Sequence, residues 1–180
     1  MNGERISYIS EVLQLHGKKY IDYESAIDKS KPTAWKYTVN IPRIMHLVYL
    51  QPIISSVCGV PISCYQLLID PTVTWDKPTW TYRDNIKRIC TQNGVVLQSL
   101  SKELQIEYNT LRRQVTQSLT MDCRVLIAIA KFLNLSVDNL LTEELSWEFG
   151  SVAASKKHYR KVATARSRIL DPDKMLDSWL

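Results

Sequence analysis

The sequence predicts an all-α fold whose best-defined part is a compact domain of five short helices at residues 81–145. Apolar residues recur there at helical spacing, which is the primary sequence signal for amphipathic helices. The gaps between the apolar segments carry residues that favour helix ends and turns. Because only a few residues separate the second predicted helix from the third, the domain is expected to be compact and to present an exposed third helix.

The first helix of this domain carries Ile86, Ile89 and Cys90 on one side. It is predicted to stop at Asn93 and Gly94, since a glycine after a helix adopts the left-handed conformation at little cost. The second helix spans about residues 97–104 and is expected to place its three leucines on one side, which are Leu97, Leu100 and Leu104.

The third predicted helix covers roughly residues 107–117 and buries Leu111 and Val115. Its polar side chains are then expected to face outward, and these are Tyr108, Asn109, Arg112 and Arg113.

The fourth predicted helix, at about residues 121–133, is the most apolar and is expected to be the central core helix. Asn134 is predicted to end it. A short fifth helix then begins at Ser136, whose hydroxyl can cap the helix, and closes with Leu140 and Leu141.

Two sequence motifs accompany this succession of helices, GVVLQSLSKEL at residues 94–104 and IAKFLNLSVDNLL at 129–141. Together with the helices, they resemble the lambda-repressor and Cro family of bacterial and phage regulators, the XRE type, over about a third of the chain. The resemblance implies a five-helix helix-turn-helix domain that binds double-stranded DNA. Two positions differ from the family pattern: Leu97 replaces a glutamine that contacts the DNA backbone, and Gln105 replaces the glycine of the turn.

The resemblance places the base-reading positions on the outer face of the third helix, since an exposed helix fits the major groove. Asn109 can make paired hydrogen bonds to adenine, and Glu107 can accept one from cytosine. Arg112 or Arg113 can reach the acceptors of guanine or a phosphate. The predicted DNA-binding residues of this domain are Gln98, Glu107, Tyr108, Asn109, Thr110, Arg112, Arg113 and Thr116.

Residues 1–70 are interpreted as a degenerate copy of the same domain. An offset of 77 residues aligns Gly17 with Gly94, and an offset of 75 aligns Gly59 with Asn134. The alternative is an unrelated helical domain used for dimerisation or for binding a partner.

The first copy departs from the pattern at two positions. Glu24 falls where the second copy has Ser101 at a small, buried site, and Pro52 is expected to interrupt the fourth helix. The outer face of the third helix is expected to act as scaffold or to contact the DNA backbone, and its residues are Ser30, Lys31, Pro32, Trp35 and Lys36.

Residues 71–80 contain two prolines and no helical period, which predicts a stiff linker. Trp75 and Trp80 are expected to pack on a neighbouring domain. Residues 146–180 are predicted to form a basic, partly helical tail, because residues 149–180 carry four more positive than negative charges. This tail either is a solvated basic helix or touches phosphate. Its predicted DNA contacts are Lys156, Lys157, Arg160 and Lys161.

Composition excludes several other function classes. The net charge of +5 and pI near 9.0 suit a polyanionic partner. The four cysteines are irregularly spaced and are expected to be reduced, with no zinc site. The three histidines are scattered and no Gly-rich phosphate loop is present, so we expect no enzyme activity, metal or cofactor. Residues 1–20 carry charges where a signal peptide needs apolar residues, which predicts a cytoplasmic protein without a membrane partner.

Two hypotheses follow from the sequence. The first is a sequence-specific, DNA-binding transcriptional regulator, a repressor from a bacterium, phage or mobile element. We expect a homodimer, because useful specificity needs two reading heads. The alternative is a protein-interaction module, such as an antitoxin or a phage-encoded inhibitor, that keeps the helix-turn-helix fold and binds a protein through its N-terminal domain.

Overall fold

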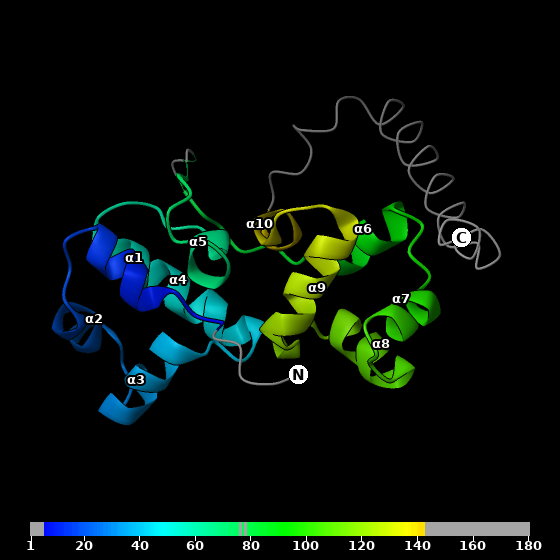
Figure 1. The fold of residues 1–180 in the computed structure, drawn as a ribbon, viewed down its shortest axis with the longest axis horizontal. Helices are drawn as coiled ribbons and strands as arrows, with labels where there is room; N and C mark the ends of the chain where they lie inside the picture. The colour runs from blue at the N-terminus through cyan, green and yellow to red at the C-terminus, as the bar shows by residue number, and fades with distance from the viewer. Residues whose placement is uncertain (1–5, 76, 78, 143–180) are drawn as a thin grey trace, which may run out of the picture.

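The computed structural model describes residues 6–75, 77 and 79–142, and these residues form α-helices and one short 3-10 helix without any β-strand. The predicted all-α fold with a five-helix helix-turn-helix domain is confirmed. Helices of the N-terminal half are α1 (Ile9–Leu15), α2 (Tyr20–Ala26), α3 (Lys31–Val39), α4 (Ile44–Cys58) and α5 (Cys64–Leu68). Elements of the C-terminal half are α6 (Ile86–Gln92), α7 (Leu97–Glu103), α8 (Tyr108–Thr116), η1 (Ser118–Thr120), α9 (Cys123–Leu133) and α10 (Val137–Leu141) (Figure 1).

Helix ends in the C-terminal half lie within two residues of their predicted positions, and local hydrogen bonds explain them. The Asp122 carboxylate accepts from the Arg124 amide and starts α9, while Asn134 ends it in the left-handed conformation at φ 54°. The Ser136 hydroxyl accepts from the Asp138 amide and starts α10, as predicted.

The residues paired by the two offsets adopt the same backbone conformation in both halves. Gly17 and Gly94 follow the first helix of each half with φ of 67° and 64°. Gly59 and Asn134 end the fourth helix of each half with φ of 72° and 54°. All four lie in the left-handed region, which L side chains rarely adopt. The descent of the two halves from one duplicated domain stays a prediction.

Backbone hydrogen bonds between the first and fifth helices also correspond. The Tyr8 amide, just before α1, donates to the Leu67 carbonyl of α5 at 2.9 Å. The Asn85 amide, just before α6, donates to the Leu140 carbonyl of α10 at 3.1 Å. The first and fifth helices are therefore tied together in the same way in each half.

The prediction that Pro52 interrupts the fourth helix is wrong, because α4 continues through it to Cys58. Proline inside a helix removes one backbone hydrogen bond and costs about 3 kcal/mol. Burial of one large apolar side chain contributes about 1.5–3 kcal/mol, so several of them outweigh that cost. The fully buried apolar residues of α4 are Ile44, Leu47, Leu50 and Ile54.

One hydrophobic core crosses from the N-terminal to the C-terminal half. Between the halves, α4 contacts η1 and α5 contacts α10. The Asp138 carboxylate of α10 accepts from the backbone amides of Cys64 and Tyr65 at the start of α5, both at 2.8 Å. This buried carboxylate therefore caps a helix of the opposite half.

The segment between the halves contains no helix in its described residues, and it packs on both. The indole Nε1 of Trp80 donates to Asp138 Oδ1 at 2.7 Å, which confirms the expected packing of this tryptophan. Trp75 is half-buried and borders a hollow of about 450 Å³ that Leu15, Val60 and Pro61 also line.

All four cysteines are buried free thiols in the structure, and their reduced state in the cell stays a prediction. None of the helices in the described part of the chain has the length and hydropathy that a membrane span requires.

Candidate nucleic-acid interface

The turn between α7 and α8 has the left-handed residue that a helix-turn-helix uses, although no glycine is present. Gln105 has φ 53°, and the next amide, of Ile106, donates back to the Ser101 carbonyl at 2.9 Å. A non-glycine residue in this conformation costs roughly 1–2 kcal/mol. The change from glycine to Gln105 therefore affects stability but leaves the geometry of the turn in place.

The apolar sides of α7 and α8 face the core as the spacing predicts. Leu100, Leu111 and Val115 are at most 3% exposed, and Leu104 is half-buried against the same core. Ser101, at the small buried site of α7, is 6% exposed and donates its hydroxyl proton to the Gln98 carbonyl. These contacts fix the rotation of α8 about its axis.

The opposite side of α8 is open to solvent in the presence of the N-terminal half. Asn109, Arg112, Arg113 and Thr116 are exposed, and Tyr108 is 39% exposed. Positions 109, 112, 113 and 116 follow the spacing of one helix face. The Thr116 hydroxyl donates to the Arg112 carbonyl at 2.7 Å, so this side chain is partly engaged by its own helix.

Glu107 acts as the N-cap of α8. Its carboxylate accepts from the amides of Asn109 at 2.8 Å and Thr110 at 2.7 Å, and these hydrogen bonds lower the pKa of Glu107. From the sequence, Glu107 is predicted to contact a base, and its role as the N-cap of α8 is not predicted. The signal in the sequence is charge alone, because a negative side chain at the start of a helix interacts favourably with its unpaired amides, while glutamate is not among the preferred N-cap residues. Base contact by Glu107 remains a prediction. The carboxylate that would make this contact already accepts hydrogen bonds from two amides.

The remaining predicted contacts lie at the edges of this surface or outside the described residues. Gln98 is exposed in the first turn of α7, and Thr110 is half-buried beside Glu107. The predicted contacts of the basic tail lie outside the described residues, and these are Lys156, Lys157, Arg160 and Lys161.

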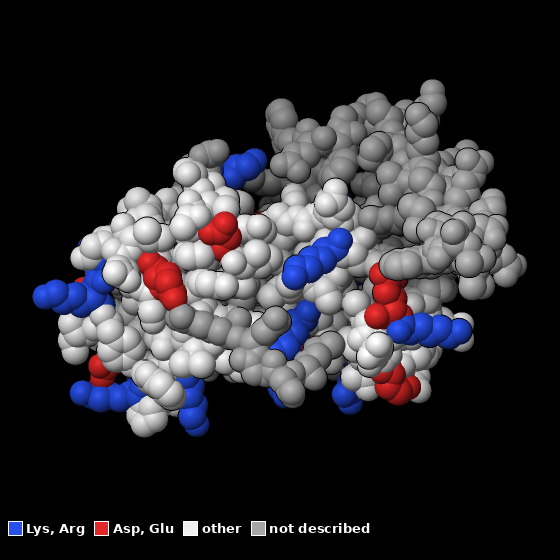
Figure 2. Space-filling model, in the orientation of Figure 1, with Lys and Arg blue, Asp and Glu red and all other residues white. Residues whose placement is uncertain are grey.

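Exposed charges of both signs surround α8. Lys102, Arg112 and Arg113 are exposed, as are Glu103 and Glu107. Figure 2 shows Lys and Arg side chains at the lower edge of both halves, where α3 and α8 lie in Figure 1. The two arginines of α8 are therefore exposed to solvent, while the Glu107 carboxylate accepts hydrogen bonds from the amides at the start of the helix.

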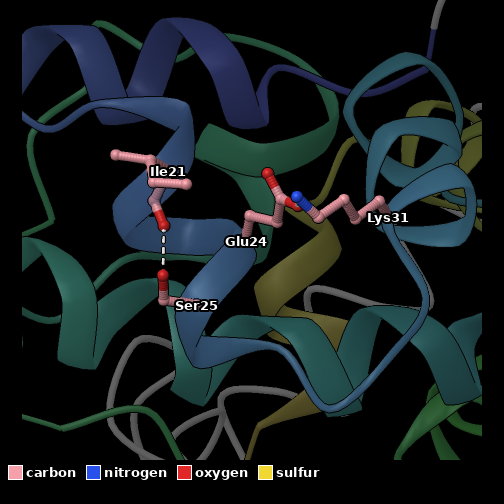
Figure 3. Close-up of polar contacts among 4 residues, drawn as sticks. All are labelled: Ile21, Glu24, Ser25 and Lys31. Carbon is pink, nitrogen blue, oxygen red and sulfur yellow. Dashed lines mark hydrogen bonds and ion pairs between the residues drawn. The ribbon is translucent and has the colours of Figure 1, made fainter.

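In the N-terminal half, a half-buried acid replaces the small residue of the second helix. The Glu24 side chain is only 13% exposed, and its Oε1 lies 3.3 Å from the Lys31 ammonium at the start of α3 (Figure 3). The same figure shows the Ser25 hydroxyl bonded to the Ile21 carbonyl at 2.7 Å within α2. The ion pair therefore links α2 to α3 where Ser101 makes only a local contact in α7.

The predicted outer face of α3 is exposed along its length, and its residues are Ser30, Lys31, Pro32, Trp35 and Lys36. Trp35 is 60% exposed, which is unusual for the largest apolar side chain.

Over 61 residues the chain is 31% identical to the SPbeta prophage-derived HTH-type transcriptional regulator YopO of Bacillus subtilis (strain 168). The similarity covers 34% of this chain and 87% of that protein. No family model matches the chain, and no solved structure does. With its helix-turn-helix and this similarity, the chain belongs to the HTH-type transcriptional regulators.

Proposed function

We propose that the chain is a transcriptional regulator of the lambda-repressor type that binds double-stranded DNA sequence-specifically and reads the major groove with α8. The observation that carries this proposal is the orientation of α8. Leu111 and Val115 face the core, while Asn109, Arg112 and Arg113 face solvent.

The exposed side chains of α8 suit the donor and acceptor pattern of the major groove. An amide such as that of Asn109 pairs with the N6 and N7 atoms of adenine, and an arginine pairs with O6 and N7 of guanine. A good bidentate pair of this kind is worth about 1–3 kcal/mol of discrimination between bases. Two or three such residues on one helix face support sequence-specific binding rather than general attraction to phosphate.

Repression is the regulatory effect that we propose, because a regulator that occupies a promoter blocks it without a further contact. The similarity to a prophage-derived transcriptional regulator supports a role in a phage, prophage or bacterial host. We propose that the protein acts in the cytoplasm of the bacterial cell, where its DNA lies.

Selection of preferred duplexes from a random pool tests the proposal. The selected duplex and a scrambled one are then titrated by fluorescence anisotropy at several salt concentrations, since phosphate contacts make affinity fall steeply with salt. Arg112→Ala is expected to weaken the selected duplex, while Lys87→Ala, which removes one exposed charge from α6, serves as the matched control. Folded protein that binds no duplex at low salt would contradict the proposal.

A further inference from the structure

The two halves of the chain meet through a reciprocal pair of backbone hydrogen bonds. The Ile44 amide donates to the Met121 carbonyl at 3.0 Å, and the Cys123 amide donates to the Pro42 carbonyl at 3.2 Å. These residues flank Arg43 and Asp122, the N-caps of α4 and α9, which form an isolated antiparallel bridge. Residues 79 positions apart exchange roles in the two bonds: Cys123 corresponds to Ile44 as donor, and Met121 corresponds to Pro42 as acceptor. Any antiparallel bridge of this kind has two reciprocal bonds, but here the bridged residues are also counterparts, since each is the N-cap of the fourth helix of its half. Contact between counterparts is what a two-fold axis produces.

The contact between α5 and α10 is consistent with the same axis. Helices α5 and α10 are counterparts, and they contact one another across the boundary. An approximate two-fold axis therefore passes through the Arg43 and Asp122 bridge and between α5 and α10. Helices α3 and α8 lie on opposite sides of this axis and at the same, lower end of the molecule in Figure 1.

Resting on the function proposed above, we propose that α3 is a second DNA-contacting helix and that one chain binds one duplex across two adjacent half-sites. In dimeric helix-turn-helix proteins, two recognition helices related by a two-fold axis enter successive turns of the major groove. Here the two helices belong to the same chain, so the arrangement of a dimer is built into a single molecule.

The chemistry of α3 fits phosphate contact better than base recognition. The offset of 77 residues places Lys36 at the position of Arg113, and it preserves the hydrogen bond that ends each helix: the Asn40 amide donates to the Lys36 carbonyl, as the Gln117 amide does to that of Arg113. A positive charge is therefore retained at this position of both helices.

The base-reading positions of α8 are occupied in α3 by residues that cannot form the paired hydrogen bonds of asparagine or arginine. The same offset places Pro32 at the position of Asn109 and Trp35 at that of Arg112. Proline has no side-chain donor, and the exposed Trp35 offers apolar surface of the kind that contacts the methyl group of thymine. The second half-site is thus bound with little sequence preference, and the operator is asymmetric.

Lys31 and Lys36 are the basic groups that α3 offers to phosphate. The Lys31 side chain is 84% exposed, whereas that of its ion-pair partner Glu24 is 13% exposed. Because the lysine ammonium is open to solvent, a phosphate can compete with Glu24 for it. Asp28 is the exposed acid next to α3 in the chain, and Lys29 stands beside it. The surroundings of α3 therefore carry a small positive excess, as those of α8 do.

The test compares Lys31→Ala/Lys36→Ala with Lys87→Ala/Lys131→Ala in the full chain, on the duplex selected for the wild type. Both pairs remove two exposed lysines, and the second pair lies outside α3 and α8. Sedimentation of the complex gives the number of chains per duplex, and anisotropy titrations give the dependence of affinity on salt. Circular dichroism checks that each variant keeps its helical content.

We expect one chain per duplex. Each phosphate contact contributes about 0.9 to the slope of log affinity against log salt. Raising the salt from 50 to 200 mM weakens binding of the wild type. The factor by which the α3 variant weakens should be about ten times smaller, because two phosphate contacts are missing, and the order of preferred duplexes should stay the same. The control variant should follow the wild type.

Two chains on each selected duplex, or an α3 variant that behaves like the control, would overturn the two-helix arrangement. If that happens while Arg112→Ala still weakens the selected duplex, the proposed function stands and only the role of α3 fails. If the wild type binds no duplex at all, both proposals fail.

Discussion

Asp138→Ala removes the carboxylate that joins the two halves of the chain. Asp138 is only 2% exposed. Its carboxylate accepts hydrogen bonds from the amides of Cys64 and Tyr65 and from the indole of Trp80 at 2.7–2.8 Å. In the variant these three donors lose their acceptor together. The cavity that remains is small, so the lost hydrogen bonds dominate the effect.

The magnitude follows from the burial of each donor. A buried donor without an acceptor costs about 1–3 kcal/mol, and Cys64 is fully buried. Tyr65 and Trp80 are half-buried, so water replaces part of what they lose. Burial raises the pKa of Asp138, although its hydrogen bonds act to lower it. Because burying the charged carboxylate is unfavourable, its removal offsets part of the loss in the free energy of unfolding. We expect the free energy of unfolding to fall by about 3–5 kcal/mol.

Urea denaturation followed by circular dichroism measures this change. The control is Asp70→Ala, because the Asp70 carboxylate is at the surface and accepts hydrogen bonds from the amide and hydroxyl of nearby Thr72. The control should change the free energy of unfolding by less than about 1 kcal/mol. If Asp138→Ala were no more destabilising than Asp70→Ala, the carboxylate would not hold α5 and α10 together.

Three further predictions concern single side chains. Gln105→Gly should raise the free energy of unfolding by about 1 kcal/mol in urea denaturation, because glycine relieves the left-handed strain; a loss of stability would refute it. Burial, with the nearby Arg43 and Lys29 charges, lowers the pKa of His46, so the unfolded chain binds the proton more readily. Stability should therefore fall as the pH drops below about 6.5, and His46→Phe should flatten this fall; equal slopes would count against it. Burial raises the pKa of the Cys58 and Cys90 thiols to about 11, so a thiol reagent at pH 8 should label neither until urea unfolds the chain, and rapid labelling of the native protein would disprove this.

The helices of the C-terminal half were predictable because their signals are local. Gly94, Asn134 and Ser136 end or begin helices through their own backbone or side chain, and the leucines of α7 repeat with the helical period. The outward orientation of Arg112 and Arg113 follows from the same period. For this reason the exposed face of α8 was correctly anticipated, while its role in binding DNA remains a proposal.

Long-range contacts were not predictable from these signals. The tolerance of α4 for Pro52 depends on the burial of its flanking residues by other helices. The cap that Asp138 gives to α5 joins residues 73 and 74 positions apart, and no spacing rule connects them. The reciprocal bridge at Arg43 and Asp122 likewise follows from how the two halves pack.

In the proposed function, the outer face of α8 distinguishes one DNA sequence from another. The decisive measurement is the ratio of affinities for the selected and the scrambled duplex, taken at one salt concentration for the wild type and for Arg112→Ala/Arg113→Ala. We expect the double substitution to lower this ratio by at least about tenfold. An unchanged ratio, with both duplexes weakened equally, would contradict it, because the two arginines would then contact only phosphate.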